Sequence, residues 1–161
     1  MTGHSSWVES LAVLSDGTLV SGSWDRTIKF WNTNTGDNIR TLTGHSDMVY
    51  SLDFLIDGSL VSGSADNTIK IWNTNNGNNI RTLTGHSGIV FSLAVLPDGT
   101  LASGSSDRTI KIWNTKTSNN IRTLTGHSNS VFSLAVLFDG TLASGSIDKT
   151  IKIWNTNTVK L

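Results

Sequence analysis

Residues 2–33, TGHSSWVESLAVLSDGTLVSGSWDRTIKFWNT, decide the fold because this stretch recurs along the chain with little change. Its opening motif, Thr-Gly-His-Ser, returns three more times, and each motif histidine lies 41 residues after the one before. These histidines are His4, His45, His86 and His127. We therefore predict one domain over residues 1–161, built from four copies of one supersecondary unit: residues 2–42, 43–83, 84–124 and 125–161.

One copy of the unit reads as four strands joined by short turns. Residues 8–14 (VESLAVL) are mostly apolar and lead to Asp16-Gly17, a pair that favours the positive φ angles of a tight hairpin. Residues 18–23 (TLVSGS) are a second run, and residues 27–33 (TIKFWNT) alternate β-branched, charged and aromatic side chains as a strand does. The more polar residues 38–42 (NIRTL) suit an outer, half-solvated strand.

This pattern predicts an all-β protein. No window has helical periodicity, and turns rich in Gly and Asn fall roughly every 8 to 12 residues. A four-stranded sheet whose inner strand is apolar on both faces must pack against neighbouring sheets, and radial packing of such sheets gives a β-propeller. We expect four blades of four antiparallel strands in the chain. The glycine of the repeated Ser-Gly-Ser is expected to let strands approach closely.

Composition and charge exclude several classes of function. Twelve basic and twelve acidic residues cancel without forming runs of one sign, so neither a nucleic acid nor a membrane is an expected partner. The absence of cysteine excludes disulfides and thiolate metal sites. The polar N-terminus does not resemble a signal peptide, which favours a cytoplasmic protein, and the apolar runs are too short to span a bilayer. No cofactor is expected.

The Gly-His pair, the Asp-x-Thr turn and a strand ending in tryptophan, repeated every 41 residues along the whole chain, resemble the WD40 (WD-repeat) β-propeller family. One departure is systematic, because the Trp-Asp dipeptide of the family reads Trp-Asn in all four copies. The resemblance implies a non-catalytic scaffold that binds proteins or peptides on its loop face. The alternative is a purely structural or engineered half-propeller fragment with no partner except itself.

The resemblance also implies a hydrogen-bonded tetrad of histidine, serine, aspartate and tryptophan in each blade. The four sets are His4, Ser21, Asp25, Trp31; His45, Ser62, Asp66, Trp72; His86, Ser103, Asp107, Trp113; and His127, Ser144, Asp148, Trp154. The sequence leaves open which serine of each Ser-Gly-Ser takes part. Because every copy carries the set, we interpret it as structural and predict no enzyme. The histidines lack the partner ligands of a metal site.

Positions that differ between the copies indicate where recognition is expected. They follow the Gly-His pair or precede the turn aspartate, two regions that the family places at one end of the ring. Large, varied side chains in loops over a rigid sheet suit a binding surface. The candidate partner-binding residues are Trp7, Trp24, Met48, Tyr50, Ile89, Phe91, Phe132 and Ile147. For Tyr50, Phe91 and Phe132 the alternative is a core position between blades.

The number of blades predicts self-association. WD40 rings usually close with seven or eight blades, so four blades cover roughly half a circle and leave an apolar face at each end. Two chains related by a two-fold axis would cover both ends, and we expect a homodimer that forms an eight-bladed ring. The competing possibility is a compact four-bladed ring, which needs about 90° per blade. The last copy lacks a full outer strand, with at best a short one at residues 158–161.

Overall fold

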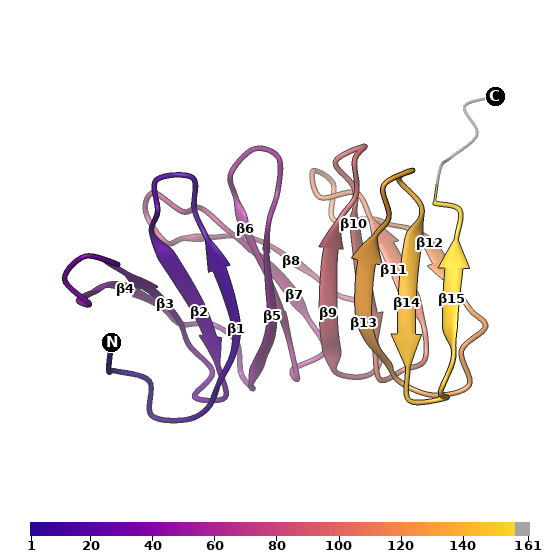
Figure 1. Ribbon diagram of the computed structural model, residues 1–161, viewed down its shortest axis with the longest axis horizontal. Coiled ribbons are helices and arrows are strands. Elements are labelled where there is room, and N and C mark those ends of the chain that lie inside the picture. Colours follow the sequence, from indigo (N-terminus) through magenta and orange to yellow (C-terminus); the bar gives the residue numbers. More distant parts are fainter. Residues whose placement is uncertain (157–161) are drawn as a thin grey trace.

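The computed structural model describes residues 1–156, which form fifteen β-strands and no helix. The strands make four antiparallel sheets that follow one another from the N-terminus to the C-terminus in an open row (Figure 1). We call these sheets blades 1 to 4. The predicted all-β propeller architecture is confirmed, whereas a closed four-bladed ring is not what the chain forms.

The strands of each blade are hydrogen-bonded in sequence order. Blade 1 contains β1 (Val8–Val13), β2 (Leu19–Ser23), β3 (Ile28–Trp31) and β4 (Asn38–Leu42). Blade 2 contains β5 (Val49–Phe54), β6 (Leu60–Ser64), β7 (Ile69–Trp72) and β8 (Asn79–Leu83). Blade 3 contains β9 (Val90–Val95), β10 (Leu101–Ser105), β11 (Ile110–Trp113) and β12 (Asn120–Leu124). Blade 4 contains β13 (Val131–Val136), β14 (Leu142–Ser146) and β15 (Ile151–Trp154). The short outer strand expected at residues 158–161 lies outside the described residues.

The turns explain why the strands end where they do. Between β1 and β2, Gly17 has a φ of 86°, and the Asp16 carboxylate accepts a hydrogen bond from the Thr18 N–H at 2.9 Å. Between β2 and β3, the left-handed position is held by a side-chain-bearing residue, Arg26, at a φ of 71°. That turn is held by Asp25, whose carboxylate accepts from both the N–H and the hydroxyl of Thr27.

The asparagine that replaces the aspartate of the Trp-Asp dipeptide caps the third turn. The side-chain oxygen of Asn32 accepts from the backbone N–H groups of Asn34 and Thr35 at 2.9 and 3.1 Å. An amide oxygen accepts hydrogen bonds at this position as a carboxylate oxygen does. The systematic departure from the family pattern therefore keeps the local structure.

The hydrophobic core lies between blades. We call the face of a blade that looks toward the following blade its trailing face, and the opposite face its leading face. The cluster between blades 1 and 2 joins Val20, Ile28, Phe30 and Leu42 of the first trailing face to Val49, Leu52, Leu60 and Trp72 of the second leading face. Equivalent clusters join blades 2 and 3 and blades 3 and 4. Each sheet is thus stabilised by burial against its neighbours.

The first strands of successive blades are joined directly, and β5, β9 and β13 lie side by side in Figure 1. The Leu52 N–H donates to the Ser10 hydroxyl at 3.1 Å, and the same contact recurs between the other neighbouring blades. Close approach also requires glycine in Ser-Gly-Ser, because a Cβ on Gly63 would lie 2.8 Å from Val90 Cγ1 of the next blade. These contacts fix the spacing of the blades.

Candidate functional site

In every blade the structure joins the four tetrad residues through hydrogen bonds. In blade 2, His45 Nδ1 lies 2.7 Å from Asp66 Oδ2, His45 Nε2 lies 2.7 Å from Ser62 Oγ, and Trp72 Nε1 donates to Ser62 Oγ at 2.8 Å. The other three blades repeat this arrangement with distances of 2.6 to 2.8 Å. The first serine of each Ser-Gly-Ser makes these bonds. The second serine bonds elsewhere: Ser64 Oγ accepts from the Asp66 N–H and donates to the Asp47 carbonyl.

The donors and acceptors of a tetrad form one directed chain. The indole N–H donates to the serine oxygen, the serine hydroxyl donates to Nε2, and Nδ1–H donates to the aspartate. Burial alone would raise the pKa of Asp66, but hydrogen bonds from His45 and Thr68 outweigh it and hold this pKa well below its ordinary value. The carboxylate is therefore charged at neutral pH and fixes the imidazole orientation.

A serine, a histidine and an aspartate at these distances resemble the nucleophile, base and orienting acid of a hydrolase. The environment of the serine argues against that chemistry. Ser62 is fully buried, and its oxygen already accepts the indole N–H of Trp72. A nucleophile needs an approach for substrate, whereas a buried and fully bonded hydroxyl stabilises the blade.

Sequence reasoning missed two further members of this network. The Thr68 hydroxyl donates to Asp66 Oδ1 at 2.6 Å, and the Ser46 N–H donates to Asp66 Oδ2 at 3.0 Å. Both residue types are present in all four copies, the threonine two residues after the aspartate and the serine directly after the histidine. That invariance between copies was the available signal.

Five candidate partner-binding residues form a continuous aromatic row across the four blades. We use the name aromatic row for Trp7, Trp24, Tyr50, Phe91 and Phe132. Successive ring centroids are 4.5 Å apart for Trp7 and Trp24, 6.1 Å for Trp24 and Tyr50, 5.2 Å for Tyr50 and Phe91, and 4.0 Å for Phe91 and Phe132. Such spacings are typical of interacting aromatic rings.

The members of the row differ in exposure. Trp7 is 69% exposed and Phe132 48% exposed, whereas Trp24, Tyr50 and Phe91 are half-buried. The Trp24 indole N–H donates to Glu9 Oε2 at 3.0 Å. Burial, followed by the nearby carboxylates of Glu9 and Asp47, raises the pKa of Tyr50. Tyr50 and Phe91, in the middle of the aromatic row, therefore have features of both a core position and a binding surface. Their rings contact each other, and part of each ring stays exposed.

The other three candidates occupy the same repeat positions as the two tryptophans: Met48 and Ile89 are equivalent to Trp7, and Ile147 is equivalent to Trp24. Met48 and Ile89 are half-buried, and the Tyr50 hydroxyl contacts Met48 Sδ at 3.8 Å. Ile147 is exposed, and its backbone N–H donates to the Ser130 carbonyl at 3.0 Å. This backbone hydrogen bond joins the loop after the Gly-His pair to the turn that holds the tetrad aspartate. It recurs in the other blades, where, for example, the Ala65 N–H donates to the Met48 carbonyl.

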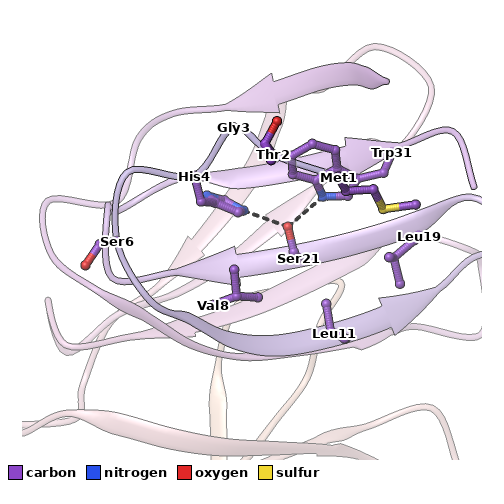
Figure 2. Close-up of a pocket in the computed structure, with 10 residues that line it drawn as sticks. All are labelled: Met1, Thr2, Gly3, His4, Ser6, Val8, Leu11, Leu19, Ser21 and Trp31. Atoms are coloured by element: carbon purple, nitrogen blue, oxygen red, sulfur yellow. Dashed lines mark hydrogen bonds between the residues drawn. The ribbon is translucent and has the colours of Figure 1, made fainter. Parts of the chain in front are cut away.

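A second accessible feature is the leading face of blade 1. Val8 is 48% exposed, whereas its equivalents Val49, Val90 and Val131 are completely buried against the preceding blade. Beside it lies a cavity of about 360 Å³ whose lining includes Leu11, Leu19 and Trp31, next to the first tetrad (Figure 2). In blades 2 to 4, the equivalents of these three residues pack against the preceding blade.

The trailing face of blade 4 is the matching surface. Ile151 is 78% exposed and Ile153 58% exposed, whereas the equivalent isoleucines of blade 3, Ile110 and Ile112, are buried. Gly145 also stands open, since a Cβ placed there would contact only Ser133 of its own blade, at 3.8 Å. Blades 1 and 4, the first and last of the four, therefore expose complementary halves of the contact that joins neighbouring blades.

Other kinds of site are absent from the described part of the chain. Within residues 1–156 no group of three or more histidine, aspartate or glutamate side chains is placed to hold a metal ion. No helix in this range is long and apolar enough to cross a membrane.

Comparison with known proteins agrees with the architecture. The family model of the WD domain, G-beta repeat, matches residues 1–32, 36–73, 77–114 and 118–155. No curated protein sequence matches the chain. Among solved structures, the WD40 β-propeller domain of Doa1 superposes with a TM-score of 0.90 at 29% sequence identity, covering 98% of this chain and 53% of that one. The chain thus spans about half the length of that propeller, and it belongs to the WD40 repeat family.

Proposed function

We propose that this protein is a non-catalytic scaffold that binds a protein or peptide at the aromatic row, and that two copies complete an eight-bladed ring. WD40 propellers generally act as non-enzymatic interaction scaffolds. The observation that supports binding here is the aromatic row itself, which crosses all four blades and leaves Trp7 69% and Phe132 48% exposed. Exposed aromatic side chains on a rigid frame are favoured anchors for partners.

The aromatic row also lies among the positions at which the four repeats differ. The tetrad residues are the same in every blade. The repeat positions of Trp7 and Trp24 instead change from one blade to the next, reading Trp7, Met48, Ile89, Ser130 and Trp24, Ala65, Ser106, Ile147. A partner lying across several blades would therefore meet a different side chain at these two positions of each blade. Such variation on a constant frame supports selective recognition of one extended ligand.

Selection from a displayed peptide library tests the binding proposal. Peptides that bind the folded protein should lose at least about tenfold in affinity when Trp7 and Trp24 are both replaced by alanine. Ile56→Ala is the matched control, because Ile56 is an equally exposed apolar residue in a different turn. Selected peptides that bind the double variant as tightly as the wild type would place recognition elsewhere.

The dimer proposal rests on the equivalence of positions between blades. In blades 2 to 4 the valine of the Val49 position packs on the glycine of the preceding Ser-Gly-Ser, as Val131 does on Gly104. Val8 and Gly145 are the two members of this series without a neighbour in the described residues. We propose that Val8 of one protomer seats on Gly145 of its partner, and that the two-fold axis repeats the contact.

The exposed apolar faces favour one alternative, a purely structural half-propeller whose partner is a second copy. Sedimentation and peptide selection together separate the two proposals. Dimers that select no peptide would support the structural module, whereas dimers that select peptides at the aromatic row support the scaffold.

A further inference from the structure

The turn between β7 and β8 of blade 2 differs in sequence from the equivalent turns of the other blades. It reads NTNNG over residues 73–77 and holds the only Asn-Gly pair of the chain, Asn76-Gly77. The equivalent pairs are Thr35-Gly36 in blade 1 and Thr117-Ser118 in blade 3. Because glycine has no Cβ, its backbone nitrogen is the least shielded from the side chain of the residue before it. The pair is therefore a candidate for a reaction of the chain with itself.

This pair lies in an accessible part of the turn. Asn76 is exposed, and Gly77 is half-buried with a φ of 78°. The Asn76 side-chain oxygen accepts from the Asn78 N–H at 2.9 Å, and the Gly77 N–H donates to the Asn73 carbonyl at 2.8 Å. A reaction between the Asn76 side chain and the Gly77 nitrogen must break these two hydrogen bonds. It therefore requires local opening of the turn, which exposed turns undergo more readily than core strands.

The same turn forms part of the joint between blades 1 and 2. Arg40 of β4 donates from Nη1 to the Thr74 carbonyl at 2.6 Å and from Nη2 to the Asn75 carbonyl at 2.7 Å. A Cβ on Gly77 would lie 2.8 Å from Leu42 Cδ2 and 2.9 Å from Arg40 Cδ. The main chain of the turn is thus held against blade 1, with no room for an additional atom beside Gly77.

We propose that Asn76 is a site of spontaneous deamidation that alters the joint between blades 1 and 2. The Gly77 nitrogen loses its proton to water or hydroxide and attacks Asn76 Cγ. The new C–N bond replaces the bond from Cγ to the side-chain nitrogen, which leaves as ammonia. Water then adds to one of the two carbonyls of the resulting succinimide and opens the ring. Opening gives aspartate in one direction and isoaspartate in the other, and each product carries a negative charge that asparagine lacks.

The two products should affect the joint differently. Aspartate keeps the length of the main chain, and its oxygen still accepts from the Asn78 N–H. Isoaspartate carries the main chain through the side-chain methylene, so it adds one atom to the turn next to Gly77. Since Gly77 already lies against Leu42 and Arg40, the longer turn should separate Arg40 from its carbonyl partners. Isoaspartate should therefore loosen the joint, whereas aspartate should leave it intact.

Incubation of the full chain at neutral and mildly alkaline pH, followed by tryptic digestion, tests the assignment. The peptide of residues 71–81, released by cleavage after Lys70 and Arg81, should gain the mass of deamidation, and fragmentation should place the change at Asn76. The rate should rise with pH, because the attacking nitrogen must lose its proton. Asn76→Thr, which introduces the residue of blades 1 and 3, should abolish the change. An unmodified Asn76, or equally fast deamidation at the other asparagines of this peptide, would overturn the proposal.

Three further variants test whether opening of this turn controls the reaction. Arg40→Ala should speed deamidation about tenfold, because opening then breaks no hydrogen bonds to a charged donor. Arg122→Ala is the matched control, since it removes the corresponding contact with blade 4, and it should leave the rate unchanged. Ser103→Ala weakens the fold in blade 3 and should also leave the rate unchanged. A rate that follows global stability and ignores Arg40 would contradict local opening.

Ion-exchange separation of the deamidated forms tests the effect on the joint. The isoaspartate form should unfold at a lower denaturant concentration than the aspartate form, and Asn76→Asp should unfold no lower than the wild type. Equal unfolding midpoints for the two forms would overturn the effect on the joint. The turn lies beside the β5–β6 turn, where the Thr74 hydroxyl donates to the Gly58 carbonyl, at the other end of the strands from the aromatic row. Failure here therefore leaves peptide selection and dimer formation as proposed, and is distinguishable from failure of the proposed function.

Discussion

Replacing Gly145 by alanine is the sharpest perturbation of the proposed contact between protomers. Within the chain, a Cβ on Gly104 would lie 2.8 Å from Val131 Cγ1, but a Cβ on Gly145 has no neighbouring blade to meet. Neither glycine is in the left-handed region, so alanine is compatible with both backbones. Gly104→Ala should therefore lower the stability of the fold, whereas Gly145→Ala should weaken the association of two chains.

The expected magnitudes follow from overpacking. Gly104→Ala forces a methyl group against a buried valine, which costs about 1 to 3 kcal/mol, offset by the roughly 0.5 to 1 kcal/mol that alanine gains over glycine in a strand. In the isolated chain the methyl group of Gly145→Ala meets no neighbouring blade. Only the gain of roughly 0.5 to 1 kcal/mol from alanine over glycine therefore applies there. In a two-fold dimer the Val8–Gly145 contact occurs twice, so association loses about 2 to 6 kcal/mol, or about 30-fold to more than about 10⁴-fold in Kd.

Sedimentation equilibrium and chemical denaturation at several protein concentrations measure the two effects separately. We expect Gly145→Ala to shift the protein toward monomer while unfolding at least as high in denaturant as the wild-type monomer. Gly104→Ala should lower the unfolding midpoint at every concentration. An unchanged Kd for Gly145→Ala would refute the seating of Val8 on Gly145, and so would a loss of monomer stability equal to that of Gly104→Ala.

Three other predictions concern the tetrads and the aromatic row. Ser103→Ala removes the acceptor of the Trp113 indole N–H and should lower the free energy of unfolding by about 2 to 4 kcal/mol. If the loss of this hydrogen bond is the cause, a double-mutant cycle with Trp113→Phe should show coupling between the two substitutions. Because the folded-state pKa of Asp66 is below its ordinary 3.8, its contribution to stability is present above pH about 4 and is lost as the pH falls toward the folded-state pKa. Acid titration of unfolding should show a shallower loss of stability for Asp66→Asn than for the wild type, and equal slopes would contradict this prediction. Trp7→Ala should change the melting temperature by less than about 2 °C, since this ring is mostly exposed, and a larger loss would assign it to the core.

The repeat and its turn chemistry made most of the fold predictable. The run at residues 8–14, the Asp16-Gly17 turn and the NIRTL segment predicted β1, its hairpin and β4 to within a residue, because these signals are local. The predicted ends of the third strand extended past Ile28–Trp31, because the neighbouring residues are taken up by turn hydrogen bonds.

Features that depend on distant partners were beyond the reach of sequence. Nothing local distinguishes Ser21 from Ser23, and only the positions of His4 and Trp31 make the first serine the tetrad member. The bond between Ser10 and the Leu52 N–H likewise follows from how blades pack. The aromatic row could be proposed from variation between copies, but the contacts that link its rings required the spacing of the blades.

Native mass spectrometry of the folded protein tests the central claim most directly, because it counts the chains in one particle. Exposed Val8 at one end and Ile151 at the other predict two chains per particle at micromolar concentration, dissociating when Gly145 carries a methyl group. A folded particle of one chain under the same conditions, or one of three or more chains, would contradict the account.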